Sequence, residues 1–254
     1  MTNTPQYTEL QGRVALITGG ASGLGLDIAH ELGRQGCHVY IADRDHARGV
    51  EQALAIANCR EFIALDVRDG ASVREAVARI HEIDGAIDIL VNSAGVLCQG
   101  PYDKVSEHQW NQLLAVNLTG VFNCIQAVTP AMRLQRSGSI INIASVSAFK
   151  GGGSVGNVWY GASKAAVVAI TQGLSRELGP DQVRVNAIAP GLIETAMVRE
   201  HVTPELKPEL LKRFPLGRLA TTADVTRMAT FLASDAAGFV SGQTIAVDGG
   251  FLAT

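Results

Sequence analysis

The run RVALITGGASGLGLDIAHELGRQ, residues 13–35, joins a short apolar stretch to an amphipathic pattern through a glycine-rich turn. Residues 13–18 are mostly apolar and β-branched, as expected of a strand buried on both faces. In residues 24–35 apolar side chains recur three and four positions apart, which indicates a helix. Glycines let the backbone approach a pyrophosphate closely, and a helix N-terminus supplies free N–H groups and a positive dipole end. The run therefore predicts a dinucleotide-binding turn between a strand and a helix.

Short β-branched runs and helical patterns alternate along the rest of the chain. The predicted strands are 13–18, 38–42, 61–67, 87–92, 139–145, 183–189 and 244–249. The predicted helices are 24–35, 71–83, 108–132, 160–178 and 222–234. Such alternation requires right-handed crossovers and a parallel sheet that is covered on both faces. We predict an α/β fold class: a single doubly wound Rossmann domain over residues 1–254, with a seven-stranded parallel sheet and helices on both faces.

Residues 194–217 do not follow this alternation. Prolines at positions 204, 208 and 215 interrupt their helical pattern, and the segment lies far from any predicted strand. We expect a mobile flap over the substrate at about 194–217. His201 lies within it and is a candidate substrate contact.

Composition limits the classes of partner. The 254 residues carry a formal charge of −3, which gives no basic surplus for nucleic acid or an anionic membrane. The N-terminal stretch lacks the features of a signal peptide, and we expect no run of the roughly 18 apolar residues that a membrane span needs. The four cysteines form no CxxC pair, and the six histidines lack metal-ligand spacing. We therefore predict a cytoplasmic protein with reduced thiols and no metal, which acts on a small molecule.

Asp43 ends the second predicted strand, 18 positions beyond Gly25. An acidic residue roughly 20 positions after the glycine turn accepts hydrogen bonds from the adenosine ribose in dinucleotide-binding folds. A carboxylate there would repel a 2′-phosphate, so the sequence favours NAD over NADP. Arg44 follows directly and could soften this preference by pairing with that phosphate.

Tyr160-Gly-Ala-Ser-Lys164 opens the predicted helix 160–178, so the first and last side chains project from one face. A phenol titrates near ~10 and is a poor base at neutral pH. A nearby ammonium and a cationic nicotinamide ring would stabilise the phenolate, so we expect a lowered pKa for Tyr160. Tyr160 can then take the proton of an alcohol during oxidation and return it during reduction.

Together these motifs resemble the short-chain dehydrogenase/reductase family, and the resemblance runs from residue 11 to residue 251. TGGASGLG at 18–25 is similar to the family's TGxxxGxG, and YGASK at 160–164 is similar to its catalytic YxxxK. NSAG at 92–95 resembles NNAG with serine in place of the second asparagine, and PGLIET at 190–195 resembles PGxxxT. The resemblance implies a nicotinamide cofactor, hydride transfer and a homotetramer.

The resemblance also implies roles for single residues. Asn117 matches the asparagine that holds a water in the proton relay from Lys164, and Asp66 with Val67 matches the adenine contact. The implied cofactor-binding set is Gly19, Ser22, Gly23, Leu24, Gly25, Asp43, Asp66, Val67, Asn92, Ala94, Gly95, Tyr160, Lys164, Pro190, Gly191, Ile193 and Thr195. The candidate substrate contacts are Ser147, Asn157 and His201.

Two serines compete for the remaining catalytic position, which bonds the substrate oxygen. The usual family spacing selects Ser147, 13 positions before Tyr160, whereas Ser145 lies 15 positions before it. We prefer Ser145, because it ends the fifth predicted strand in a register that matches the family's NISS. The glycine-rich residues 151–157 can absorb a two-residue insertion, since loops tolerate changes of length. The predicted catalytic set is Asn117, Ser145, Tyr160 and Lys164.

Three functions follow from these motifs. The preferred one is an NAD-dependent dehydrogenase that converts a polyol, sugar or cyclic secondary alcohol to its ketone. The alternative is a 3-oxoacyl-[acyl-carrier-protein] reductase. Two features disfavour it: Asp43 would repel the phosphate of NADPH, and the sequence shows no evident basic patch for an acidic carrier protein. The remote alternative is a non-catalytic NAD-sensing regulator on the same fold, which would be expected to lack part of the catalytic set.

Overall fold

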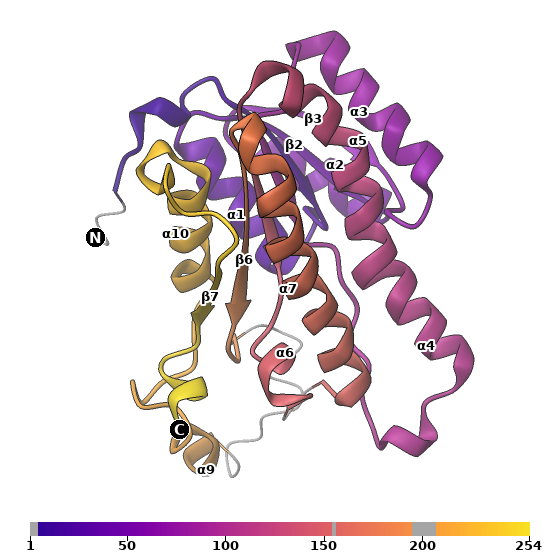
Figure 1. The fold of residues 1–254 in the computed structure, drawn as a ribbon, viewed down its shortest axis with the longest axis vertical. Helices are drawn as coiled ribbons and strands as arrows, with labels where there is room; N and C mark the ends of the chain where they lie inside the picture. The colour runs from indigo at the N-terminus through magenta and orange to yellow at the C-terminus, as the bar shows by residue number, and fades with distance from the viewer. Residues whose placement is uncertain (1–4, 154–155, 195–206) are drawn as a thin grey trace.

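A computed structural model describes residues 5–153, 156–194 and 207–254, and its centre is one parallel sheet (Figure 1). The strand order is β3-β2-β1-β4-β5-β6-β7, which confirms the predicted seven-stranded, doubly wound sheet. The chain winds outward from β1 to β3 on one side and from β4 to β7 on the other. A crevice is expected at this switch point, outside the carboxyl ends of the strands. The strands are β1 (Val14–Thr18), β2 (His38–Asp43), β3 (Cys59–Ala64), β4 (Ile89–Asn92), β5 (Gly138–Ile143), β6 (Val183–Pro190) and β7 (Thr244–Val247).

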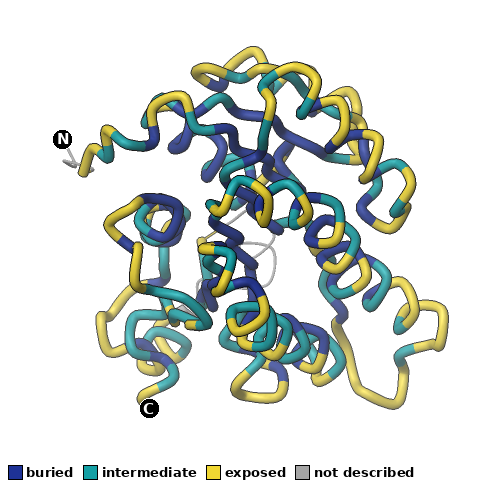
Figure 2. The backbone as a smooth tube through the Cα atoms, turned by 45° about the horizontal axis from the view of Figure 1, so that its top comes forward, coloured by how far each residue is buried: buried dark blue, intermediate teal, exposed yellow. Residues whose placement is uncertain are grey.

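Helices cover both faces of the sheet, as the apolar runs of the strands require. One apolar cluster packs α3, α5 and α7 against the sheet, and a second packs α1 and α10 against the other face. Figure 2 shows the buried backbone concentrated in the central strands and the exposed backbone on the outer helix surfaces. The helices are α1 (Gly23–Arg34), α2 (His46–Ala55), α3 (Gly70–Asp84), α4 (Glu107–Leu114), α5 (Gly120–Gln135), α6 (Ser147–Lys150), α7 (Val158–Leu178), α9 (Lys207–Leu211) and α10 (Thr222–Ala233).

Three local features differ from the sequence-based prediction. The helix α2 was not predicted, and Asp45 begins it by accepting a hydrogen bond from the Arg48 backbone N–H. The strand predicted at 61–67 ends at Ala64, so the residues after it belong to a loop. The helix predicted at 108–132 contains a π-helical segment, Ala115–Thr119, between α4 and α5.

The continuous helical run Glu107–Gln135 is long and apolar enough to cross a membrane by length and composition, which differs from our expectation that no run qualifies. Part of its apolar surface belongs to the core: Cys124, Val128 and Met132 are buried in the cluster that packs against the sheet. Burial against the sheet therefore accounts for the apolar character of this helix.

Residues 195–206, which make up most of the predicted flap, lie outside the described residues. The segments before and after these residues are joined by a parallel β-bridge between Ile193 and Ala220. Beyond α9, Phe214 and Leu219 pack with Phe251 near the C-terminus in a third apolar cluster. In Figure 1 the arrowheads of β6 and β7 point toward the end of the molecule where α6, α9 and the C-terminus lie.

Candidate functional site

A cavity of about 630 Å³ opens at the carboxyl ends of the strands, as expected for this topology. Its wall begins at the turn after β1, crosses the ends of β2, β4 and β5, and continues to the end of β6. The structure brings most of the predicted site residues together here. The predicted residues that line the cavity are Gly19, Ser22, Gly23, Leu24, Gly25, Asp43, Asp66, Val67, Ala94, Gly95, Ser145, Ser147, Tyr160, Lys164, Pro190, Gly191 and Ile193.

Two glycines in the turn after β1 leave space that no other residue would leave. A Cβ atom on Gly19 would lie 2.8 Å from the backbone of Ala94, and one on Gly25 would lie 2.3 Å from the carbonyl oxygen of Gly19. Gly19 also has a φ of +67°, in the left-handed region that favours glycine. The turn, the loop after β4 and the first helical turn of α1 can therefore pack closely around the cavity.

The N-terminus of α1 faces this cavity with its backbone donors available. Ser22 is the N-cap residue, but its side chain makes no capping hydrogen bond. The first N–H groups of a helix need partners and attract an anion, so the turn fits a pyrophosphate. Asp43 completes this end of the cavity, and its carboxylate accepts hydrogen bonds from the backbone N–H groups of Ala21 (3.2 Å) and Asp45 (3.1 Å). These residues fit the pyrophosphate and the adenosine ribose of a dinucleotide.

Asp66 and Val67 lie in the loop after β3 and line the same end of the cavity. The Asp66 carboxylate accepts hydrogen bonds from the Arg68 guanidinium, at 2.6 Å for the shortest, and these bonds lower the pKa of Asp66. The carbonyl oxygen of Val67 accepts a 2.8 Å hydrogen bond from the side chain of Asn123 on α5. These contacts anchor the loop beside the cavity.

Asn92, by contrast, does not line the cavity. It is buried at the end of β4, and its amide donates a 2.9 Å hydrogen bond to the side-chain oxygen of Asn142 on β5. Asn142 in turn donates to the hydroxyl of Thr171 on α7 at 2.9 Å. Asn92 thereby links two strands and a helix, and its assignment to the cofactor stays a prediction.

Ser93 replaces the family's second asparagine, and the structure shows how the loop is held without it. The Thr18 hydroxyl oxygen accepts hydrogen bonds from the backbone N–H groups of Ser93 (3.2 Å) and Ala94 (3.3 Å). The end of β1 thereby fixes the loop after β4 through backbone atoms. Serine in place of asparagine leaves this attachment intact.

Tyr160 and Lys164 lie one turn apart in the first half of α7, with the Lys164 nitrogen 5.9 Å from the centre of the Tyr160 ring. Lys164 is buried and donates a 2.7 Å hydrogen bond to the carbonyl oxygen of Ile143, the last residue of β5. Burial lowers the pKa of Lys164 to about 8. The lysine is therefore positioned by the end of a strand beside the phenol.

The pKa of Tyr160 is raised in the structure, whereas we expected it to be lowered. Burial is the larger cause, because a buried phenolate loses its hydration. A side-chain hydrogen bond with Ser145 acts in the opposite direction, and no effect of Lys164 on the phenol is resolved. The residues of the chain alone therefore keep Tyr160 protonated at neutral pH.

Ser145 is the serine whose side chain lowers the pKa of Tyr160. It follows β5 by two residues, so the strand ends earlier than the predicted 139–145. Ser147 is buried at the first position of α6, and its backbone N–H donates to the Ser145 side-chain oxygen at 3.1 Å. Both serines line the cavity, but of the two only Ser145 affects the pKa of Tyr160.

Asn117 is fully buried in the π-helical segment between α4 and α5. Its side-chain oxygen accepts a 2.8 Å hydrogen bond from the Val96 backbone N–H, and its amide donates to the Val96 carbonyl oxygen (3.0 Å) and to the Ser163 hydroxyl (3.1 Å). Asn117 thereby joins the loop after β4 to α7. It stands behind the cavity wall and does not line the cavity itself.

Of the predicted substrate contacts, Ser147 lines the cavity and Asn157 does not. Asn157 is the N-cap of α7, and its side-chain oxygen accepts hydrogen bonds from the backbone N–H groups of Trp159 (3.1 Å) and Tyr160 (3.2 Å). Its amide donates to the Gln99 and Gly100 carbonyl oxygens. These contacts use both ends of its amide, and the assignment of Asn157 to the substrate stays a prediction. Thr195 and His201 lie outside the described residues.

Sequence reasoning missed several residues that line the cavity. Arg48 was missed with α2, and the cap residue Asp45 was the signal that could have revealed this helix. Leu210, Phe214 and Phe251 carry no local motif, and only the folded chain brings them to the cavity. No cluster of histidine, cysteine, aspartate or glutamate able to hold a metal occurs in the described part of the chain.

Comparisons with known proteins agree with this site. A family model described as enoyl-(acyl carrier protein) reductase matches residues 19–252. The 3-oxoacyl-[acyl-carrier-protein] reductase of Staphylococcus epidermidis is 38% identical over 240 residues, which cover 93% of this chain and 97% of that protein. A short-chain type dehydrogenase/reductase of Sinorhizobium fredii, itself uncharacterised, is 37% identical over 96% of this chain and 98% of its own.

A solved structure is similar over nearly its whole length. The gluconate 5-dehydrogenase of Burkholderia cenocepacia, solved in complex with NADP and tartrate, superposes with a TM-score of 0.89 at 37% sequence identity and covers 96% of each chain. Family model, relatives and solved structure all extend over more than nine-tenths of the chain. The chain belongs to the short-chain dehydrogenase/reductase family and is an oxidoreductase of that family.

Proposed function

We propose that this chain is an NAD-dependent dehydrogenase that transfers a hydride between a secondary alcohol and nicotinamide, giving the ketone. The observation that carries the proposal is that Ser145, Tyr160 and the buried Lys164 line one cavity, which also contains a glycine turn and Asp43. A set of polar groups that converge in one large pocket is typical of a catalytic site.

Each catalytic side chain has a distinct task in this proposal. Ser145 donates a hydrogen bond to the reacting oxygen and stabilises the charge that develops on it. Tyr160 accepts the proton of the alcohol during oxidation and returns it during reduction. Lys164 places its ammonium beside the phenol and favours the phenolate. Bound nicotinamide supplies the hydride acceptor for oxidation and the hydride donor for reduction.

We further propose a preference for NAD over NADP. Asp43 supports it, because a carboxylate can accept hydrogen bonds from a ribose diol but repels a 2′-phosphate. Arg44 and Arg48 also line this end of the cavity and would weaken the preference. The gluconate 5-dehydrogenase to which the chain is similar was solved with NADP, so cofactor choice needs a direct measurement.

A second candidate is a 3-oxoacyl-[acyl-carrier-protein] reductase. The name of the Staphylococcus epidermidis relative favours it. The same three catalytic side chains would serve it in the reduction direction. Oxidation of an alcohol with NAD and reduction of a 3-oxoacyl thioester with NADPH distinguish the two candidates.

We also propose a cytoplasmic homotetramer. The four cysteines are all unpaired, which suits a reducing compartment. On α5, Phe122 and Leu134 are 54% and 88% exposed, and exposed apolar side chains on a long helix suit a contact with another copy. Light scattering at micromolar concentration tests the tetramer, and a monomeric mass would refute it.

The experiment that tests the activity is NAD reduction, followed by absorbance, over a panel of polyols, cyclic alcohols and 3-hydroxyacyl thioesters. We expect turnover of a secondary alcohol by the wild-type chain and none by Tyr160→Phe, which keeps the ring but lacks the proton-transferring oxygen. Turnover at the wild-type rate by Tyr160→Phe would overturn the proposed mechanism.

A further inference from the structure

The chemistry of the cavity wall changes along its length. The charged side chains Asp43, Arg44, Arg48 and Asp66 follow β2 and β3, at the end where the adenosine half of a dinucleotide would lie. Ser145 follows β5, three strands away from β2 in the sheet. The side chains near Ser145 therefore decide which substrate reaches Tyr160.

The substrate end is apolar among the described residues. Val146, Leu192 and Leu210 pack with Phe214 and Phe251 in one cluster, and all five line the cavity. Glycines at 152, 153 and 156 also line this part of the cavity and offer no side chains. At the substrate end, the described wall offers one side-chain hydrogen-bonding group besides Ser145, Tyr160 and Lys164. This group is the hydroxyl of Ser147.

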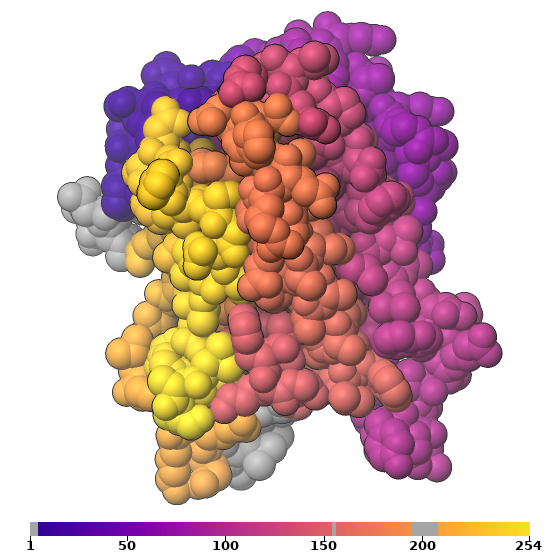
Figure 3. Space-filling view, viewed as in Figure 1, coloured from indigo at the N-terminus to yellow at the C-terminus, as the bar shows by residue number. Residues whose placement is uncertain are grey.

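Phe214 and Phe251 form a fixed aromatic wall. Their ring centres are 5.1 Å apart at an interplanar angle of 26°, and both side chains are buried. Figure 3 shows the C-terminal residues lying against the segment that contains α9. The Asp248 carboxylate accepts hydrogen bonds from the backbone N–H groups of Gly250 (3.0 Å) and Leu252 (2.9 Å), on either side of Phe251. This capping fixes the ring in place.

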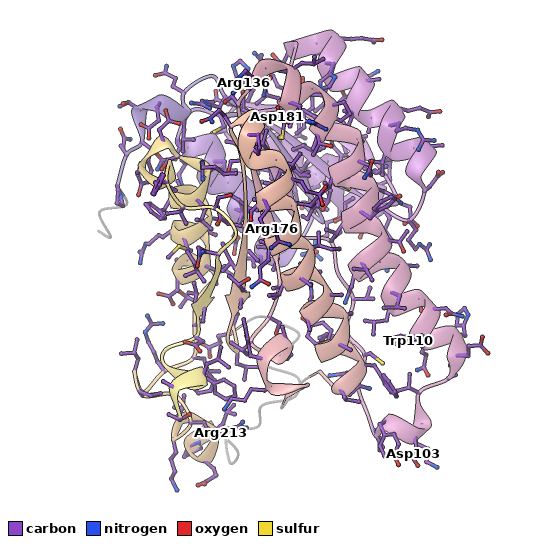
Figure 4. The ribbon with its side chains drawn as sticks, in the orientation of Figure 1. Asp103, Trp110, Arg136, Arg176, Asp181 and Arg213 are labelled. Carbon is purple, nitrogen blue, oxygen red and sulfur yellow. The ribbon has the colours of Figure 1, made fainter. Side chains whose placement is uncertain are left out.

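Two cations near Phe251 in the described part of the chain lie outside the cavity wall. The Lys150 nitrogen and the Arg213 guanidinium carbon lie 5.1 Å and 4.7 Å from the centre of the Phe251 ring. Both side chains are exposed, and neither is part of the cavity wall. Figure 4 shows the labelled Arg213 beside α9 at the edge of the molecule. A carboxylate or phosphate on the substrate would find no cation in the described wall near Ser145 other than the catalytic Lys164.

We propose that the substrate end takes a secondary alcohol, and its ketone, with an apolar alicyclic or aryl skeleton, and that Phe251 is a specificity-determining residue. The inference rests on the proposed function and narrows its substrate class. An apolar skeleton gains by leaving water against these side chains. A polyol would bury hydroxyl groups that the described wall does not partner, and each buried hydroxyl without a partner costs binding free energy.

The test compares 1-phenylethanol and cyclohexanol with sorbitol and a 3-hydroxybutyryl thioester as substrates of the wild-type chain. We expect kcat/KM for the first two to exceed that for the others by about 10² or more, the range by which pocket contacts discriminate. Phe251→Ala is expected to raise KM for 1-phenylethanol by about 10-fold with kcat little changed. Phe239→Ala is the matched control, because Phe239 is 106% exposed and lies outside the described wall.

A second variant and a binding measurement separate specificity from folding. Phe251→Leu keeps an apolar side chain, so its KM should lie between those of the wild type and Phe251→Ala. With cofactor present, 1-phenylethanone should raise the Tm of the wild type and of Phe239→Ala more than that of Phe251→Ala. Preference for sorbitol or the thioester, or equal KM in Phe251→Ala and Phe239→Ala, would overturn this inference and leave hydride transfer intact. Absence of turnover with all four substrates would overturn the proposed function as well.

Discussion

The backbone N–H of Ser147 donates a 3.1 Å hydrogen bond to the side-chain oxygen of Ser145. This bond occupies a lone pair of the Ser145 oxygen and leaves its own proton available for the Tyr160 oxygen or the substrate. Ser147 thus orients Ser145 through a backbone atom, which any residue other than proline would supply. Ser145 and Ser147 therefore have different roles. Ser145 is the hydroxyl donor, and the backbone of Ser147 holds that hydroxyl in position.

Alanine substitutions of the two serines should therefore have unequal effects. Ser145→Ala removes the donor to the reacting oxygen, and loss of one such donor lowers kcat by about 10² to 10³. Ser147→Ala keeps the backbone N–H, so kcat should fall less than about 10-fold, with the main effect on KM. Steady-state kinetics of both variants measure this. The reverse ranking would show that the usual family spacing of 13, which selects Ser147, is the better guide.

Asn157→Ala should lower stability rather than substrate affinity. An N-cap side chain contributes about 1 kcal/mol, and Asn157 accepts two N–H groups at the start of α7. Asn157→Asp keeps the accepting oxygens and loses the amide donor to Gln99 and Gly100, so most of the stability should remain. Chemical denaturation and KM, measured on both variants, distinguish a helix-capping role of Asn157 from a substrate contact. A large rise in KM at unchanged stability would restore Asn157 as a substrate contact.

The sequence predicted the sheet because each strand is apolar on both faces and each turn carries glycine or a polar residue. It missed α2, because only five of residues 46–55 are alanine or another apolar residue, and the cap Asp45 was the clearest signal of this helix. The ends of β1 and β4 were predicted correctly, whereas the end of β3 was displaced by three residues, because apolar side chains continue into the loop at Leu65 and Val67.

The cofactor end and the catalytic side chains were predictable because they lie in short local motifs. The substrate end was not, because Phe214 and Phe251 meet only through the packing of two distant segments. The roles of Asn92 and Asn157 stay predictions for a related reason. Each residue occupies a motif or loop beside the cavity, and the motif does not reveal that hydrogen bonds turn the Asn92 side chain toward the protein interior and the Asn157 side chain toward the helix end.

Asp43 should decide the cofactor preference. Its carboxylate accepts hydrogen bonds from Ala21 and Asp45, so it is held at the edge of the cavity. Asp43→Ala should narrow the ratio of kcat/KM for NAD to that for NADP, because it removes the repulsion and leaves Arg44 and Arg48. Asp45→Ala is a control that changes a nearby carboxylate outside the cavity wall. Equal kcat/KM for both cofactors in the wild type would contradict the assignment.

Tyr160→Phe and Lys164→Ala should differ in their effect on cofactor affinity. The phenol acts on the substrate, so Tyr160→Phe should abolish turnover and leave the Kd for NAD nearly unchanged. Lys164 can also serve the nicotinamide ribose, so Lys164→Ala should weaken NAD binding as well as turnover. Fluorescence titration with NADH measures both affinities. Equal losses of affinity in the two variants would refute the separate roles.

The buried Lys164 should set an upper pH limit for ketone reduction. Burial lowers its pKa to about 8, so the ammonium loses its proton as pH rises through this value, whereas an exposed lysine stays charged to about 10. Tyr160 has a raised pKa and stays protonated over this range. The fall in rate therefore comes from loss of the positive charge on Lys164, which favours the phenolate. The rate of reduction should be level below pH 8 and fall above it. Lys104→Met, which changes an exposed lysine outside the cavity wall, should keep this profile. A rate that stays level to pH 10 would show that Lys164 remains charged in the working enzyme, and that its hydrogen bond to Ile143 outweighs its burial.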